Sequence, residues 1–421
     1  MSHIVSTFRE SFSPLRIRNF RVYLSGQGVS LVGTWLQMTA QGWVVWQLSH
    51  SNAALGTVAM LSTLPLLLLG PWMGVWADRL DRRKLLIVTQ ASAMVLAFIL
   101  AILVQTNAIQ LWHVYILSTL LGIVTALDMP TQQAFIGDLS GMGQVRRAVV
   151  LNAMIIQISR MLGPALAGYM IGALGVATAF WLNGLSFLAV IASLIAVRAN
   201  QIRKPTSGNP LGEFREGLRF IGGQPRILDL ILFTVLVTFF GLPIIAILPS
   251  VATNILHGQA ESLGLLMAAS GAGALVGTLF VTPLAQSLRR TGVVVGSAVV
   301  WTGCWFVLFS ISTWLPLSML CLFLVSLSVP TVITTANGML QVLAQPNMRV
   351  RLLSTFVMVS FGAQPIASLV LGYSADAIGV LAAIRVNGLL LISGAIFLLA
   401  IRPNLRQWEA NRQPVDAANV P

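Results

Sequence analysis

Charged residues are scarce in this sequence. Only 9% of its 421 residues are Asp, Glu, Lys or Arg, and just 12 are acidic. A soluble domain carries roughly 25% charged residues. So few charges could not cover the surface of a globule in water, and the deficit runs along the whole chain. We therefore expect the lipid bilayer to surround most of the protein.

Cysteine and catalytic patterns are also sparse. The two cysteines, Cys304 and Cys321, show neither a disulfide framework nor metal-ligand spacing, and we expect them to be small packing residues. No cluster of His, Cys and carboxylates and no nucleophile–base arrangement stands out, so nothing predicts an enzyme, a metal site or another cofactor. A Gly-x-x-x-x-Gly-Lys loop is missing too, which excludes transport driven by an ATPase of the chain itself.

Long apolar segments are abundant instead. A membrane-spanning helix needs about 20 mainly apolar residues, and 56% of this chain is hydrophobic. The pattern predicts twelve spans, at 20–48, 53–77, 84–105, 109–137, 147–172, 175–198, 227–255, 261–286, 291–312, 314–341, 351–376 and 379–401.

The positive charges are unevenly distributed along the chain. The net charge of +13 would suit a nucleic-acid partner, but every Lys and Arg except Arg160 and Arg385 lies at the termini or on alternate connections between the predicted spans. Cytoplasmic loops of membrane proteins carry this excess. The pattern therefore predicts an even number of spans with both termini in the cytoplasm, and no nucleic-acid partner.

The chain reads as two related halves. A polar linker, 199–225, separates an N-terminal six-helix bundle, 1–198, from a C-terminal six-helix bundle with its tail, 226–421, and its part 211–221 is expected to form a short amphipathic helix. A shift of 204 residues aligns Gly168-Tyr169 with Gly372-Tyr373. A parallel repeat of this kind occurs in transporters whose site lies between the halves.

A loop signature follows the second predicted span. Its residues, Gly74, Asp78, Arg79, Arg82, Arg83 and Lys84, resemble the signature of the major facilitator superfamily, with Asp81 in place of its second glycine. The resemblance implies an all-α membrane protein in which twelve transmembrane helices form two pseudo-symmetric six-helix bundles. It also implies that this loop latches the cytoplasmic side. The alternative is that the basic residues only fix the membrane orientation.

Two further segments narrow the resemblance. Gly163, Pro164 and Gly168 resemble the Gly-Pro motif of antiporters and exporters, and their small side chains would allow close helix packing. Gly273 and Gly277 offer a matching surface on the eighth span. The segment 126–135 resembles the enterobactin-exporter and macrolide-efflux branch, which implies a bacterial cytoplasmic (inner) membrane location.

Two charged residues of the N-terminal half lie well inside predicted spans. Asp128 and Arg160 are candidates for proton coupling, because charges in the bilayer are costly and are retained for function. Neighbouring antiparallel helices would bring Arg160 towards Asp128 or Gln133. The alternative is a buried structural pair.

Spans 1, 4, 7 and 10 line the cavity in the resembled fold. The candidate substrate-binding residues on them are Gln37, Gln41, Gln132, Gln133, Asn337, Gln341 and Phe239. They would suit a large, partly apolar ligand.

Together these features predict a monomeric secondary active transporter, driven by protons, that exports an amphipathic small molecule such as a drug or siderophore by alternating access. The alternatives are an importer or a lysolipid flippase of the same fold, or a membrane sensor that transports nothing.

Overall fold

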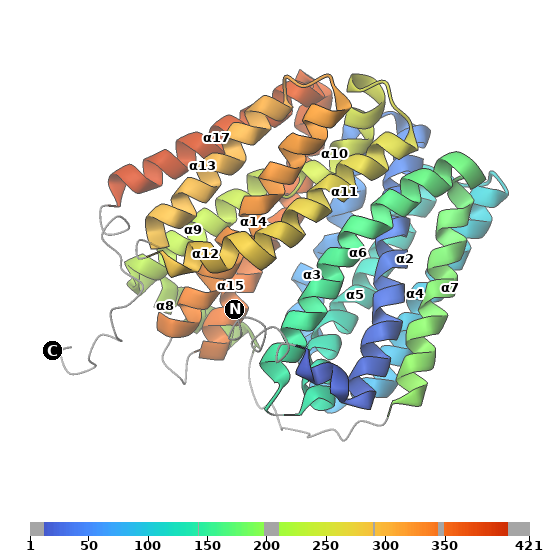
Figure 1. The fold of residues 1–421 in the computed structure, drawn as a ribbon, viewed down its shortest axis with the longest axis horizontal. Helices are drawn as coiled ribbons and strands as arrows, with labels where there is room; N and C mark the ends of the chain where they lie inside the picture. Colours follow the sequence, from blue (N-terminus) through green and yellow to red (C-terminus); the bar gives the residue numbers. More distant parts are fainter. Residues whose placement is uncertain (1–11, 142, 198–209, 289–290, 344–348, 403–421) are drawn as a thin grey trace, which may run out of the picture. The chain divides into compact units, whose positions relative to one another are not determined.

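The computed structural model describes residues 12–141, 143–197, 210–288, 291–343 and 349–402 (Figure 1). All regular elements in these ranges are helices. Contacts divide the chain into two compact units: Met1–Ser207 with Ala246–Ala272, and Gly208–Ile245 with Gly273–Pro421. The division of the chain at 198 and 226 into two six-helix bundles stays a prediction.

The first unit contains both long and short helices. They are η1 (Ser13–Arg16), α2 (Arg18–Ser49), α3 (Asn52–Arg79), α4 (Arg82–Gln105), α5 (Leu111–Ser140), α6 (Val145–Leu174), α7 (Val176–Ala196), α10 (Ile244–Ser250) with the π-helical η2 (Val251–Ile255), and the first part of α11 (Ala260–Val276). Helix α2 packs along α6 and α7, α3 along α5, and α4 along α5 and α7.

The second unit contains the other helices. They are α8 (Pro210–Gly223), α9 (Pro225–Phe240), the π-helical η3 (Gly277–Val281), α12 (Thr282–Ser287), α13 (Thr291–Phe309), α14 (Leu315–Leu343), α15 (Arg349–Gly362), α16 (Gln364–Ile378) and α17 (Val380–Ile401). Helix α13 packs between α14 and α17. The segment expected to form a short amphipathic helix lies in α8.

The described helices confirm an all-α membrane protein, with eleven of them long and apolar enough to cross a membrane. The remaining predicted span, 20–48, lies in the continuous helix α2, which is not among the eleven. Several glutamines, including Gln27, Gln37 and Gln41, make α2 more polar than the other spans. The count of twelve therefore agrees approximately with the structure.

Two predicted spans are interrupted rather than straight. The span 227–255 is broken after Phe240, where the turn Gly241-Leu242-Pro243 separates α9 from α10. The span 351–376 is broken at Ala363, which precedes Pro365 at the start of α16. Proline lacks a backbone N–H and cannot continue the hydrogen-bond ladder of a helix, so both breaks have a local cause.

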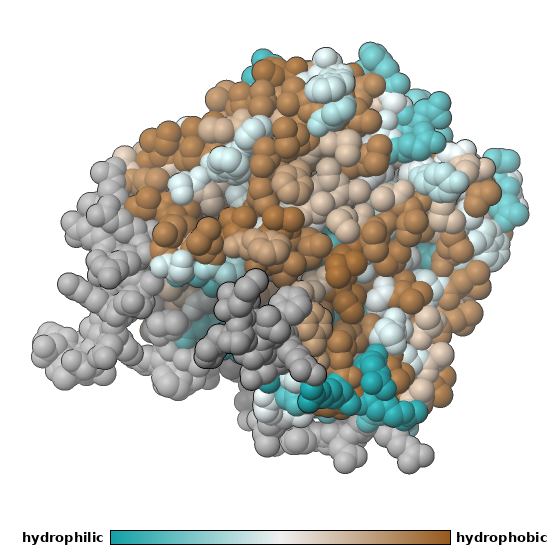
Figure 2. Space-filling model, viewed as in Figure 1, coloured by the Kyte–Doolittle hydropathy of each residue, from teal (hydrophilic) through white to brown (hydrophobic). Residues whose placement is uncertain are grey.

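The core of the first unit lies between α2, α4, α5, α6 and α7. Phe20, Tyr23, Leu86, Phe135 and Leu194 are fully or almost fully buried there. Outside this core, many large apolar side chains are exposed, among them Trp72, Leu120, Tyr169, Leu174 and Ile195. The visible face is largely hydrophobic in Figure 2. Exposed apolar side chains on membrane-length helices fit contact with lipid tails.

Candidate functional site

Asp128 lies on α5, where neutral donors from two helices surround its carboxylate. Thr89 and Gln90 of α4 reach Oδ1 at 2.6 and 3.0 Å, and Gln132, one turn further along α5, donates to Oδ2. Gln27 of α2 then donates to Gln132 Oε1 at 3.2 Å. We call these five residues the Asp128 network. It joins α2, α4 and α5, and Asp128 is the one charged residue in it.

The Asp128 network keeps unused acceptors. Gln27 Oε1 and Gln90 Oε1 are buried and have no hydrogen-bond partner among the described residues. The hydroxyl of Tyr23, one turn before Gln27 on α2, is also buried without a hydrogen-bond partner among the described residues. The ring of Tyr23 packs edge-on against Phe135, with 5.4 Å between centroids. Polar atoms therefore remain available close to the carboxylate.

The hydroxyl of Thr89 has two acceptors within reach. Its Oγ1 lies 2.6 Å from Asp128 Oδ1 and 3.0 Å from the carbonyl oxygen of Leu86. A hydroxyl has one proton to donate. It can donate to an ionised Asp128, or it can donate to Leu86 while accepting from a protonated Asp128.

Sequence reasoning found Asp128 and Gln132 but missed Gln27, Thr89 and Gln90. The available signal was the adjacent polar pair Thr89-Gln90 within an otherwise apolar span. Neither residue is charged, so the search for charged groups in the bilayer passed over them.

Arg160 lies on α6 and does not contact Asp128. Its guanidinium stands 5.5 Å from the centroid of the Trp35 ring on α2, and Nη2 lies 3.4 Å from Ser270 Oγ on α11. The described contacts of Asp128 and of Arg160 share no residue. The expected approach of Arg160 to Asp128 or Gln133 is therefore not found, because this side of α6 faces α2 and α11.

Two of the candidate substrate-binding residues on α2 are used to hold helices together. Gln37 accepts a hydrogen bond of 2.7 Å from Asn183 of α7, and Gln41 donates one of 2.9 Å to Ser118 of α5. Both glutamines are buried. Gln133 of α5, in contrast, is exposed.

The remaining cavity candidates lie in the second unit. Gln341 donates to Asn337 one turn earlier on α14, at 3.2 Å, and is exposed. Phe239 of α9 packs against Phe240 with 4.9 Å between ring centroids. For all seven cavity candidates, a role in substrate binding stays a prediction.

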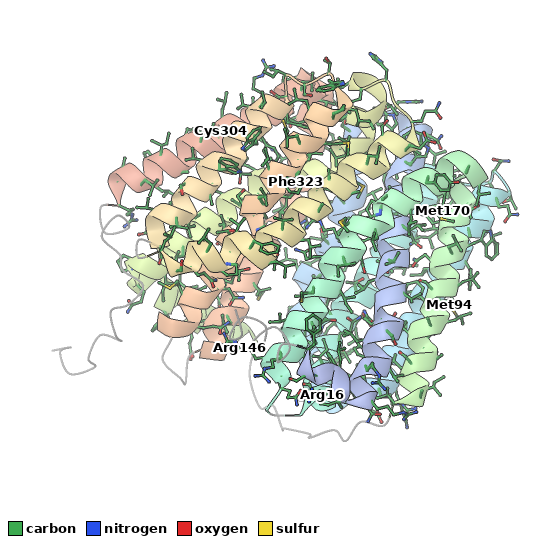
Figure 3. The ribbon with its side chains drawn as sticks, viewed as in Figure 1. Arg16, Met94, Arg146, Met170, Cys304 and Phe323 are labelled. Carbon is green, nitrogen blue, oxygen red and sulfur yellow. The ribbon has the colours of Figure 1, made fainter. Side chains whose placement is uncertain are left out.

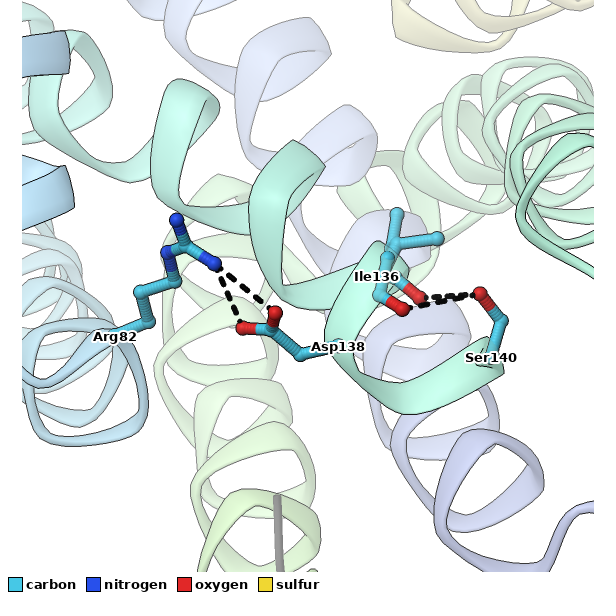
Figure 4. Close-up of polar contacts among 5 residues, drawn as sticks. Arg82, Ile136, Asp138 and Ser140 are labelled. Atoms are coloured by element: carbon cyan, nitrogen blue, oxygen red, sulfur yellow. Dashed lines mark hydrogen bonds and ion pairs between the residues drawn. The ribbon is translucent and has the colours of Figure 1, made fainter. Parts of the chain in front are cut away.

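The loop signature forms contacts at one end of the first unit. Arg82 donates to both carboxylate oxygens of Asp138 at the end of α5, at 2.9 and 3.0 Å (Figure 4). Arg83 donates to the carbonyl oxygens of Leu194 and Ile195 in the last turn of α7. These contacts tie α4 to two neighbouring helices. Arg16 and Arg146 lie at the same end of this unit (Figure 3).

Asp81, the departure from the signature's second glycine, has a local role. Its carboxylate caps the start of α4 by accepting from the backbone N–H of Lys84 at 3.1 Å. Arg79 is exposed at the end of α3. The surroundings of Gly74 and the side chain of Asp78 lie outside what the structure describes, and the latch stays a prediction.

The glycines of α6 bring two helices close to it. A Cβ on Gly163 would lie 2.5 Å from Trp35 Cβ of α2, and one on Gly168 would lie 2.9 Å from the carbonyl oxygen of Ala260. Gly264 of α11 approaches the carbonyl oxygen of Pro164 in the same way. Close packing of this helix is therefore present.

The expected partners of these glycines were wrong. Gly273 and Gly277 pack against the backbone of α14, at Phe323 (Figure 3) and Leu327, while Gly264 and Gly271 approach α6. The residues that face α6 lie earlier on α11 than the sequence suggested.

A sequence profile of the transmembrane secretion effector family, a branch of the major facilitator superfamily, matches residues 9–421. The chain belongs to this family. As a member of it, the protein is a multi-pass membrane transporter of small molecules and not an enzyme.

Similar proteins include transporters and efflux pumps. The chain is 25% identical over 275 residues to the staphyloferrin A transporter of Staphylococcus aureus, covering 65% of this chain and 68% of that one. It is 24% identical to the multidrug efflux pump Tap of Mycolicibacterium fortuitum, over 93% and 95% of the two chains. It is 23% identical to macrolide efflux protein A of Streptococcus pyogenes, over 92% and 96%.

Solved structures agree on the fold. A bacterial homologue of the human lysosomal transporter Spinster, at 13% identity, covers 95% of this chain and 100% of its own with a TM-score of 0.73. A POT family transporter in complex with 5-aminolevulinic acid gives a TM-score of 0.72 at 11% identity, over 92% and 96% of the chains.

Proposed function

We propose that this transporter exports an amphipathic small molecule from the bacterial cytoplasm by alternating access, and that protons entering through Asp128 drive it. The protein acts as a monomer in the inner membrane with both termini in the cytoplasm. The observation that carries the proposal is the Asp128 network, in which an acid inside a membrane-spanning helix contacts only neutral partners.

A proton is the charge that can neutralise Asp128. Among the described residues no Lys, Arg or His pairs with its carboxylate. Charged groups inside a membrane are costly, and they mark ion pathways in many transporters. An acid without a fixed counter-charge can gain and lose a proton as the protein opens to either side.

The Asp128 network accommodates both protonation states. With Asp128 ionised, Thr89, Gln90 and Gln132 all donate to the carboxylate. With Asp128 protonated, its O–H can donate to Thr89 Oγ1, whose own proton then points to the carbonyl oxygen of Leu86. Only one hydroxyl has to rotate. The unused acceptors of Gln27 and Gln90 can bind a water that brings the proton.

The outward direction is supported by two observations. Relatives over nine tenths of the chain are named as efflux pumps. The segment Gly163-Pro164 of α6 also resembles the Gly-Pro motif of antiporters and exporters.

The test uses everted membrane vesicles with a fluorescent amphipathic dye and an imposed proton gradient. Wild-type protein should accumulate dye when the interior is acidic. Asp128→Asn should lose this accumulation but still exchange dye across vesicles with equal pH on both sides. Retained exchange shows that the variant is folded and uncoupled.

Other results would contradict the proposal. Gradient-driven accumulation that persists in Asp128→Asn would move the coupling site elsewhere. Dye that is driven out of everted vesicles would indicate an importer.

A further inference from the structure

Arg160 is a cation with few acceptors around it. Its guanidinium carries five N–H groups, and the described residues supply one hydrogen-bond acceptor, Ser270 Oγ. Trp35 covers the guanidinium with its ring and accepts no conventional hydrogen bond. No described carboxylate pairs with Arg160. Most of its donors are therefore available to a ligand.

The helices that surround Arg160 contain almost no acid. Helices α2 and α6 have no Asp or Glu at all, and α11 has one, Glu261. Glu261 contacts Gly172 of α6. Gly172 lies twelve residues beyond Arg160, which is about 18 Å along the helix. The counter-charge for Arg160 therefore does not come from the helices that hold it.

Two glycines allow the neighbouring helices to pack closely around Arg160. A Cβ on Gly271 of α11 would lie 2.6 Å from the backbone oxygen of Arg160 itself. A Cβ on Gly163, one turn after Arg160, would lie 2.5 Å from Trp35 Cβ. Helices α2 and α11 thus both lie close to α6 near Arg160, and this packing holds Trp35 and Ser270 in position before any ligand arrives. Such preorganisation lowers the cost of binding.

We propose that Arg160, held in place by Trp35 and Ser270, binds the carboxylate of an amphipathic organic anion, and that such anions are the substrate class of this transporter. A carboxylate matches the planar fork of the guanidinium with two parallel hydrogen bonds. Ser270 orients the guanidinium by accepting a hydrogen bond from Nη2, and the indole of Trp35 packs against the apolar part of the ligand. The proposal rests on the proposed transport function and does not depend on Asp128.

The test measures binding, with no proton gradient, to the purified full-length protein in phosphatidylcholine nanodiscs. The probes are 1-naphthaleneacetate and its neutral counterpart 1-naphthaleneacetamide, which share the apolar ring. Wild-type protein should bind the carboxylate about tenfold or more tightly than the amide, as expected for hydrogen bonds between charged groups.

Three variants complete the test. Arg160→Gln should bind the two probes equally, and Arg160→Lys, which keeps the charge but loses the fork, should keep a reduced preference. Asp128→Asn should keep the full preference. Loss of coupling in that variant therefore leaves the anion site intact. The Asp128 variant tests proton coupling and the Arg160 variants test anion binding, so either proposal can be contradicted without the other.

Two outcomes would overturn the proposal. One is a wild type that binds both probes equally, or a preference that Arg160→Gln and Arg160→Lys leave unchanged. The other is loss of 1-naphthaleneacetate binding when phosphatidylglycerol is added to the nanodiscs, which would identify the occupant as an anionic lipid.

Discussion

Asp128 and Arg160, two charged residues well inside the spans of the first unit, have opposite surroundings. Three neutral donors meet the carboxylate of Asp128, whereas an aromatic face and one hydroxyl meet the guanidinium of Arg160. The acid has its hydrogen bonds supplied by the protein and lacks only a charge partner. The cation lacks acceptors as well. This difference suggests a proton for the first residue and an anionic ligand for the second.

The largest effect should come from separating the helices at Arg160. Gly271→Leu places a side chain against the backbone oxygen of Arg160, which cannot move aside. Overpacking of this kind costs about 1–3 kcal/mol or more. We expect a lower thermal unfolding temperature and loss of the preference for 1-naphthaleneacetate over its amide.

The control for this change is Gly143→Leu, because a Cβ at Gly143 meets no atom within 4 Å. It should leave both the unfolding temperature and the probe preference unchanged. A Gly271→Leu protein that still prefers the carboxylate would show that the close approach does not organise the Arg160 site.

A smaller effect is expected from removing the hydroxyl that contacts Asp128. Thr89→Val keeps the shape of the side chain but removes the donor, and a hydrogen bond to a charged acceptor contributes about 1.5–3 kcal/mol. Dye accumulation driven by the proton gradient should slow by about tenfold or more. Dye exchange at equal pH should stay near the wild-type rate.

Thr89→Ser is the matched control for that experiment, since it retains the hydroxyl and should retain most of the driven transport. Equal slowing of driven transport and exchange in Thr89→Val would indicate a structural role for Thr89 instead of one in proton transfer.

The smallest effect should follow from Gln27→Leu. Gln27 contacts Gln132 and not Asp128 itself, so the carboxylate keeps all three donors. Removing one neutral hydrogen bond costs about 1 kcal/mol. Driven transport should fall by less than it does in Thr89→Val. A larger fall in the same vesicle assay would place Gln27 on the proton path.

The sequence was informative about the fold because the bilayer imposes simple rules. Span length, apolar composition and the position of Lys and Arg depend on the membrane and not on packing. The same rules identified Asp128 and Arg160, because a charge in an apolar segment is visible without a structure. The breaks at Gly241 and Ala363 also had local signals in nearby prolines.

Contacts between helices were harder to foresee. The rotation of each helix about its axis decides that Arg160 faces Trp35 and Ser270, and that Gly271 instead of Gly273 meets α6. In the same way, the rotation of α2 about its axis turns Gln37 towards Asn183 of α7. These choices depend on which neighbours pack together, and a single sequence does not record them.

Proton movement in proteoliposomes tests the central claim most directly. Purified protein is reconstituted in weakly buffered vesicles, an outward gradient of dye is imposed, and a pH indicator reports the internal medium. Wild-type protein should acidify the interior in proportion to dye efflux, because protons enter as dye leaves, and Asp128→Asn should exchange dye without any change in pH. Dye-coupled proton movement that persists in Asp128→Asn would contradict the account.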